Sequence, residues 1–142
     1  MRLFLDASVL LAACGSATGA SRAIFDHAPA QGWVLVCVPY VLNEVLNNLA
    51  DFPPAASVEW ARLRRTLLVM DDVLTVDRPA VFPAGKDRPV LFSALAWADV
   101  LLTLDRGDFE ALLGSAFYEL RVLRPGQWIR AERDSGRMPR VF

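Results

Sequence analysis

The sequence has few of the side chains that carry histidine, zinc or disulfide chemistry. It contains one histidine, His27, and two cysteines, Cys14 and Cys37, among 142 residues. A lone histidine with no obvious partner acid or nucleophile argues against Ser-His-Asp and Cys-His sites. Two cysteines in apolar surroundings supply neither a zinc site nor a disulfide framework. We therefore expect two buried free thiols and a histidine at the surface or at a helix end.

Long apolar runs and a large net charge are also missing. Although 54% of the residues are hydrophobic, no apolar run approaches the ~20 residues of a membrane span. The first residues faintly resemble a signal peptide, but Asp6 interrupts their apolar stretch. We expect a cytoplasmic protein that makes no use of a membrane. The net charge of −1 gives no global field that would attract nucleic acid.

The basic residues are nearly all arginine, and Lys86 is the only lysine among 15 basic residues. Two groups stand out: Arg62, Arg64 and Arg65, and then Arg121, Arg124, Arg130, Arg133, Arg137 and Arg140. The planar fork of arginine binds two phosphate oxygens at once. These groups are therefore candidates for phosphate contacts, and solvated helix faces in an arginine-rich chain are the competing explanation.

Short, nearly continuous apolar segments alternate with amphipathic ones. The short segments are typical of buried parallel strands, and they are Arg2–Leu5, Trp33–Val38, Leu74–Val76, Val100–Thr103 and Arg121–Leu123. Helical spacing predicts helices over Ser21–Ala28, Pro39–Asp51, Ser57–Met70, Asp87–Trp97, Asp108–Leu113 and Pro125–Arg133. This alternation predicts a three-layer α/β/α sandwich with a mainly parallel central sheet. We expect one domain over residues 1–133 and a frayed tail over 134–142.

Two acids follow predicted strands directly. Asp6 comes after "RLFL", and Asp105 comes two residues after "VLLT". Because sites in open α/β sheets form outside the carboxyl ends of the strands, both acids fall where a site would be. Asp99 lies at the start of its strand, at the opposite edge, and we discount it.

Two further acids can reach the same edge, although each has a simpler explanation. Glu44 lies off the apolar stripe of its predicted helix, where it could be plain solvent surface. Asp87 precedes a helix with Pro89 in its first turn and could be an N-cap. Asp71, Asp72 and Asp77 have no comparable placement, and we expect them to be solvated.

A metal ion would reconcile these acids with one another. Asp6, Glu44, Asp87 and Asp105, with Asp108 nearby, cannot share a pocket as free anions, because repulsion would push protons onto some of them. A divalent cation removes the conflict, and all-oxygen ligands favour Mg²⁺ or Mn²⁺ over zinc. Such a site serves phosphoryl transfer.

At this point the sequence resembles the PIN domains, a family of small metal-dependent ribonucleases. The matching pieces are "FLDASVLLAA", "VPYVLNEVLNNL", "KDRPVLFSALAWADVLLTLDRGDF" and "LRPGQWI". They cover nearly the whole chain in the family's order. The sequence departs modestly from the family, with Ser8 in place of the commoner Asn or Thr and a variant ending in "TLDRGDF". Neither departure removes an acid.

The resemblance implies the function and the roles of the residues. The family's catalytic acids fall on Asp6, Glu44, Asp87 and Asp105, with Asp6, Asp87, Asp105 and Asp108 as metal ligands and Ser8 and Thr103 in support. A metal-activated water would hydrolyse an RNA phosphodiester, leaving 5′-phosphate and 3′-hydroxyl ends. Many bacterial members are toxins of toxin–antitoxin pairs and form homodimers. RNA, an antitoxin and a second copy of the chain are therefore the expected partners.

Three alternatives remain. A phosphoacceptor receiver domain requires adjacent acids early in the chain, where Asp6 stands alone. A haloacid-dehalogenase-type phosphatase requires Asp at the position of Ser8. The serious alternative is an interaction module that uses the same fold for dimer or antitoxin binding with little catalysis. Binding of Mn²⁺ through Asp6 and Asp105 would separate a catalyst from such a module.

Overall fold

A six-stranded sheet forms the centre of the part of the chain that the computed structural model describes, which is residues 1–73, 88–105, 116–117 and 119–139. The strands are β1 (Arg2–Leu5), β2 (Val34–Cys37), β3 (Leu68–Val69), β4 (Val100–Leu102), β5 (Ala116–Phe117) and β6 (Leu120–Leu123). Their spatial order is β3-β2-β1-β4-β6-β5, with β5 antiparallel to β6 and all other neighbours parallel. The predicted mainly parallel sheet is confirmed.

β1 after Arg2 and the whole of β4 are apolar because helices cover both of their faces. Leu3, Phe4 and Leu5 of β1 are fully buried, and so is β4 from Val100 to Leu102. Strands of this kind show no alternation of apolar and polar residues. This explains why continuous apolar segments in the sequence predicted them correctly.

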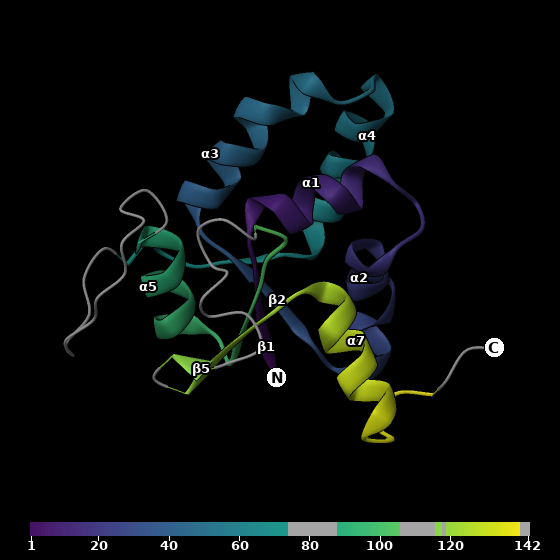
Figure 1. Cartoon of the computed structure of the whole chain (residues 1–142). Helices are drawn as coiled ribbons and strands as arrows, with labels where there is room; N and C mark the ends of the chain where they lie inside the picture. The colour runs from purple at the N-terminus through teal and green to yellow at the C-terminus, as the bar shows by residue number, and fades with distance from the viewer. Residues whose placement is uncertain (74–87, 106–115, 118, 140–142) are drawn as a thin grey trace.

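The helices form the two outer layers. They are α1 (Ala7–Gly15), α2 (Ala20–Gln31), α3 (Pro39–Asn48), α4 (Pro54–Leu63), α5 (Arg88–Trp97) and α7 (Pro125–Asp134), with single 3₁₀ turns η1 (Leu49–Asp51) and η2 (Arg64–Thr66). The steps from β1 to β2 to β3 cross the sheet in one direction and the step to β4 crosses in the other. Right-handed crossovers therefore place their helices on opposite faces. Figure 1 shows α5 on one side of the strands and α2 and α7 on the other, which confirms the three-layer sandwich.

Several predicted boundaries differ from the structure. Helix α1 was not predicted, because "ASVLLAACG" is apolar nearly all round and shows no helical period. The predicted helix over Ser57–Met70 is wrong beyond Leu63, where the chain turns through η2 into the two-residue strand β3. The predicted strand Leu74–Val76 and the predicted helix Asp108–Leu113 lie outside the described residues.

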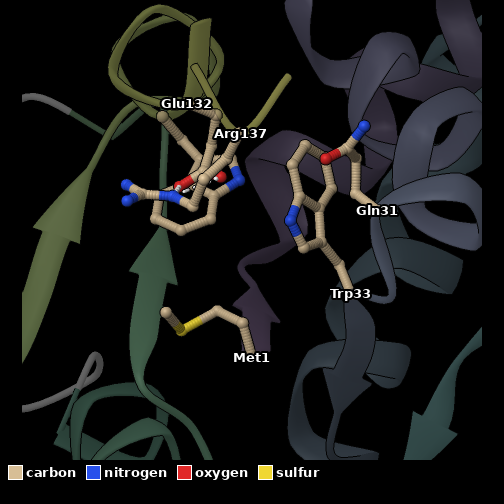
Figure 2. A pocket seen from close by; sticks show the side chains of 6 residues that line it. Met1, Gln31, Trp33, Glu132 and Arg137 are labelled. Atoms are coloured by element: carbon tan, nitrogen blue, oxygen red, sulfur yellow. Dashed lines mark hydrogen bonds and ion pairs between the residues drawn. The ribbon is translucent and has the colours of Figure 1, made fainter. Parts of the chain in front are cut away.

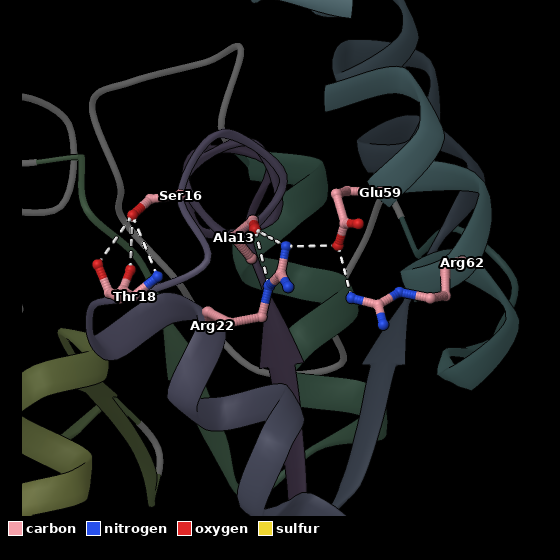
Figure 3. Close-up of polar contacts among 6 residues, drawn as sticks. All are labelled: Ala13, Ser16, Thr18, Arg22, Glu59 and Arg62. Atoms are coloured by element: carbon pink, nitrogen blue, oxygen red, sulfur yellow. Dashed lines mark hydrogen bonds and ion pairs between the residues drawn. The ribbon is translucent and has the colours of Figure 1, made fainter. Parts of the chain in front are cut away.

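A buried arginine fixes the end of α1 (Figure 3). Arg22 of α2 is 6% exposed, and its Nε and Nη2 atoms donate to the carbonyl oxygen of Ala13 at 2.9 and 2.8 Å. The same Nη2 lies 2.7 Å from Oε2 of Glu59 in α4, which also accepts from Arg62 at 2.6 Å. These contacts join α1, α2 and α4, and they satisfy a carbonyl near the end of α1 that has no partner within the helix.

The chain after α7 folds back onto it. Met138 is 1% exposed, and its N–H donates to the carbonyl oxygen of Glu132 at 3.2 Å. The Nε of Arg137 donates to both carboxylate oxygens of Glu132, beside a cavity of about 320 Å³ that Trp33 also lines (Figure 2). The prediction of a frayed tail is therefore wrong up to Met138.

The expectations about the cysteines and about membrane spans can be compared with the structure. Cys14 and Cys37 are buried free thiols, as predicted. Among the described residues no single helix combines the length and hydropathy of a membrane span, and α1 and α2 reach them only together, across a bend of 95°.

Candidate active site

Strands β1 and β4 meet at the point where the direction of the chain crossings reverses. From β1 the chain moves to β2 and β3 on one side, and then to β4 and β6 on the other. Ligands of open α/β sheets bind at such switch points, outside the carboxyl ends of the strands. Leu5 pairs with Leu102 in register, and the N–H of Asp6 donates to the carbonyl oxygen of Leu102 at 3.1 Å. Asp6 and Asp105 therefore leave the sheet at the same edge, as predicted.

Asp6 is held in place by three hydrogen bonds. Asp6 is 5% exposed, and its Oδ1 accepts from the N–H of Ala7 at 2.8 Å. Its Oδ2 accepts from Thr103 Oγ1 at 2.8 Å and from Ser8 Oγ at 3.2 Å. Asp6 is also the N-cap residue of α1, in extended conformation. The carboxylate is thus fixed by both the strand and the helix that it joins.

The two hydroxyl groups also tie Asp6 to the segment after β4. The N–H of Leu104 donates to Ser8 Oγ at 3.0 Å, and the N–H of Asp105 donates to Thr103 Oγ1 at 3.0 Å. Thr103 is fully buried. Both residues expected to support the site therefore lie beside Asp6. Through them, the position of the Asp105 backbone depends on the position of the Asp6 carboxylate.

The electrostatics of the pair favour a cation. Burial raises the pKa of Asp6 above its ordinary value of 3.8, and the negative charge of Asp105 adds to this rise. The hydrogen bonds from Thr103, Ala7 and Ser8 lower the same pKa. A carboxylate that is desolvated next to another carboxylate is stabilised in its charged form by a positive charge.

The other predicted acids are Glu44, Asp87 and Asp108. Glu44 is half-buried on α3, the helix that begins at the carboxyl end of β2. Asp87 and Asp108 lie outside the described residues. Within the described ranges no three acidic, histidine or cysteine side chains come together closely enough to hold a metal ion. The structure thus brings Asp6 and Asp105 together, and the other ligands stay predictions.

Two acids outside the predicted set have structural tasks. Oδ2 of Asp99 accepts from the N–H of Arg2 at 2.8 Å, at the amino edge of the sheet where we expected it. Asp72, which we expected to be merely solvated, accepts from the N–H of Tyr40 at 3.0 Å and so caps the first turn of α3. Asp72 follows β3, so recognising that short strand would have placed it at the carboxyl edge.

Comparison with known proteins supports the fold. No family model and no curated protein sequence matches the chain. Solved structures do match, and two of them are VapBC2 from Rickettsia felis, bound to a DNA fragment from their promoter, and VapC20 from Mycobacterium tuberculosis, a sarcin–ricin loop cleaving toxin. The first match has a TM-score of 0.61 and 12% identity over 86% of this chain and 97% of that chain. The second has a TM-score of 0.51 and 18% identity over 84% and 98%.

The chain has the PIN-domain fold. The match extends over nearly the full length of both solved chains. Within this fold, Asp6 and Asp105 follow the two strands that meet at the switch point. At identities this low, structural similarity establishes the fold alone. The chemistry must be argued from the residues of this chain.

Proposed function

We propose that the protein is a metal-dependent endoribonuclease. One observation carries the proposal: Asp6 and Asp105 follow adjacent strands at the switch point of a PIN-fold sheet, linked by the hydroxyls of Thr103 and Ser8. The likeness to a sarcin–ricin loop cleaving toxin supports RNA as the substrate. The products expected are 5′-phosphate and 3′-hydroxyl ends.

The residues fit Mg²⁺ or Mn²⁺ better than any other cofactor. The donors at the site are carboxylate oxygens, which these hard cations prefer. Burial, with a smaller contribution from the charge of Asp105, raises the pKa of the Asp6 carboxyl, and a bound cation would offset both effects. Asp6 and Asp105 would hold the cation, with Asp87 and Asp108 as further ligands and Glu44 as the fourth catalytic acid. The cation, when bound, would neutralise the acids and activate water towards phosphorus.

The chain's own residues contribute rigidity to this site. Thr103 and Ser8 hold the Asp6 carboxylate in one orientation before substrate arrives. The same hydroxyls accept from the backbone N–H groups of Leu104 and Asp105 and so fix the backbone that carries the second carboxylate. Ligands positioned in advance need no reorganisation during the reaction.

We further propose that the ribonuclease is the toxin of a toxin–antitoxin pair and works as a homodimer in the cytoplasm. The similarity to VapBC2, solved as a pair on its promoter DNA, supports an antitoxin partner. Induced expression of the parent chain should arrest bacterial growth, whereas the Asp6→Asn variant should not. Equal growth under both would contradict the toxin role and leave the nuclease proposal standing.

An interaction module with little catalysis is the second candidate, and exposed apolar side chains favour it. Leu46 of α3 is 58% exposed and Val58 of α4 is 70% exposed, and both helices lie on the same part of the molecule (Figure 1). A partner that covered them would gain apolar burial. Such a module would keep its partner but would not bind Mn²⁺ or cut RNA.

The test is cleavage of a panel of structured RNAs with Mn²⁺, with Mg²⁺ or with chelator. The parent is compared with Asp6→Asn and Asp105→Asn, and Asp99→Asn is the matched control because Asp99 lies at the opposite edge of the sheet. We expect metal-dependent cleavage that is lost in the first two variants and kept in the control. No cleavage by the folded parent with either metal would favour the interaction module.

A further inference from the structure

A second cavity lies between α2 and α7 and has a basic lining. Its volume is about 350 Å³, within the range of small ligand sites. The lining residues are Gly19, Ala20, Ala23, Gly126, Ile129, Arg130 and Arg133. None of them is acidic, and five of the seven are small or apolar. The cavity therefore presents two positive side chains on an otherwise uncharged wall.

The two arginines have no ion-pair partner among the residues that the structure describes. The ion pairs that the described residues form with one another involve other arginines. Glu59 pairs with Arg22 and Arg62, and Glu132 pairs with Arg137. Arg130 is exposed, whereas Arg133 is half-buried and its Nε is buried with no hydrogen-bond acceptor. A buried donor of this kind is costly unless something accepts from it. An anion in the cavity would supply that acceptor.

The backbone around the cavity adds to its positive character. Helix α2 starts after Gly19, whose φ of 101° suits glycine, and it has no side-chain cap at this end. Its first N–H groups are therefore free of a capping oxygen, and helix N-termini of this kind attract anions. The first turn of α7 is close by, since a methyl group on Gly126 would lie 3.8 Å from Cβ of Ala20.

The cavity lies towards the edge of the sheet that carries the acids. Helix α7 begins where β6 ends, and β6 neighbours β4. The N–H of Thr103, directly after β4, donates to the carbonyl oxygen of Leu123 at 3.0 Å. Helix α2 ends just before β2 begins, so its start points back towards the carboxyl edge. An RNA strand whose scissile phosphate met Asp6 and Asp105 could therefore reach this cavity with a neighbouring phosphate.

We propose that the cavity between α2 and α7 is a phosphate subsite, in which Arg130, Arg133 and the start of α2 bind an RNA phosphate other than the one that is cut. This inference rests on the proposed nuclease function. It names two members of the second arginine group as RNA contacts. In the first group, Arg62 is paired with Glu59.

The experiment measures binding of a labelled RNA hairpin in the Asp6→Asn background, which binds without cutting, between about 50 and 200 mM salt. Arg130→Gln with Arg133→Gln removes two charges. Arg2→Gln with Arg62→Gln is the control of equal charge change, because Arg2 lies at the amino edge of the sheet and Arg62 is paired with Glu59. We expect the first pair to weaken binding at least about tenfold and to reduce the slope of log K against log salt by about 0.7 to 1.4, the value for one to two contacts on a single strand. The control should change neither, and Arg133→Lys should restore most of the slope.

A second measurement keeps failure of this site distinct from failure of the nuclease proposal. Inorganic phosphate is titrated into isotopically labelled protein, and the resonances of Gly19, Ala20, Gly126 and the Arg133 Nε–H group are followed. Saturable shifts that are lost in the Arg130→Gln, Arg133→Gln variant support the anion site even if the protein cuts no RNA. An RNA affinity and salt slope equal to those of the parent overturn the phosphate subsite even if cleavage is intact. That result would point to a carboxylate of a protein partner as the occupant.

Discussion

Replacement of Thr103 by valine tests the coupling between the two carboxylates. The hydroxyl donates to the Asp6 carboxylate at 2.8 Å and accepts from the Asp105 N–H at 3.0 Å, and the side chain is fully buried. A hydrogen bond to a charged group contributes about 1.5–3 kcal/mol and a neutral one about 1 kcal/mol. We therefore expect Thr103→Val to lower the free energy of unfolding by about 2–4 kcal/mol near neutral pH.

The loss should depend on pH in a definite direction. Burial already raises the pKa of Asp6 above 3.8, and the Thr103 hydrogen bond opposes that rise, so the variant should have a still higher pKa. A group with a raised pKa in the folded state binds its proton more tightly there. Stability therefore falls as pH increases from the unfolded pKa to the folded one. In Thr103→Val this fall should be deeper and should extend to higher pH than in the parent.

Urea unfolding across this pH range, in chelator, measures both effects. Thr66→Val is the matched control, because its hydroxyl donates to the neutral carbonyl of Leu63 at 2.7 Å in the exposed turn η2. The control should lose no more than about 1 kcal/mol at any pH. If Thr103→Val lost less than about 1 kcal/mol near neutral pH, or the same amount in acid, the hydroxyl would not be holding a charged carboxylate.

Three further predictions follow from other buried groups. Asp6→Asn removes a desolvated charge, so without metal its melting temperature near neutral pH should equal or exceed that of the parent while cleavage is lost; a large drop would contradict the electrostatic argument. Arg22→Met should lower the free energy of unfolding by about 2–4 kcal/mol, because it leaves a helix carbonyl without a hydrogen bond and removes a buried charge. Arg62→Met, at the exposed end of the same network, should lower it by less than about 1 kcal/mol. Burial raises the pKa of Cys14 to about 11 and that of Cys37 to about 12, so a thiol reagent at about pH 8 should modify them only after unfolding; rapid modification of the native protein would show that one of them is accessible.

The sequence was informative where burial leaves a simple pattern. β1 and β4 are covered on both faces, so their continuous apolar residues predicted strands and placed Asp6 and Asp105 at one edge. Their adjacency was not predictable, because it depends on the sheet order, which the register of Leu5 with Leu102 records. Two hydroxyl residues, Ser8 and Thr103, could be named only from the resemblance to PIN domains.

Other features left no usable pattern in the chain. Helix α1 is apolar on nearly all sides, and β3 has only two residues, so neither shows a period. The burial of Met138 depends on the chain folding back onto α7, which local sequence does not encode. The cavity lined by Arg130 and Arg133 arises from two helices that are about a hundred residues apart in sequence.

The central claim is that the acids at the carboxyl edge of β1 and β4 hold a divalent cation. The most direct test is a measurement of Mn²⁺ binding without RNA, in which the electron paramagnetic resonance signal of the free ion reports the unbound concentration. The parent and Asp99→Asn should bind Mn²⁺ alike, because Asp99 caps β1 at the opposite edge, whereas Asp6→Asn and Asp105→Asn should lose most of the affinity. Equal binding by all four proteins, or none by the folded parent, would contradict the account.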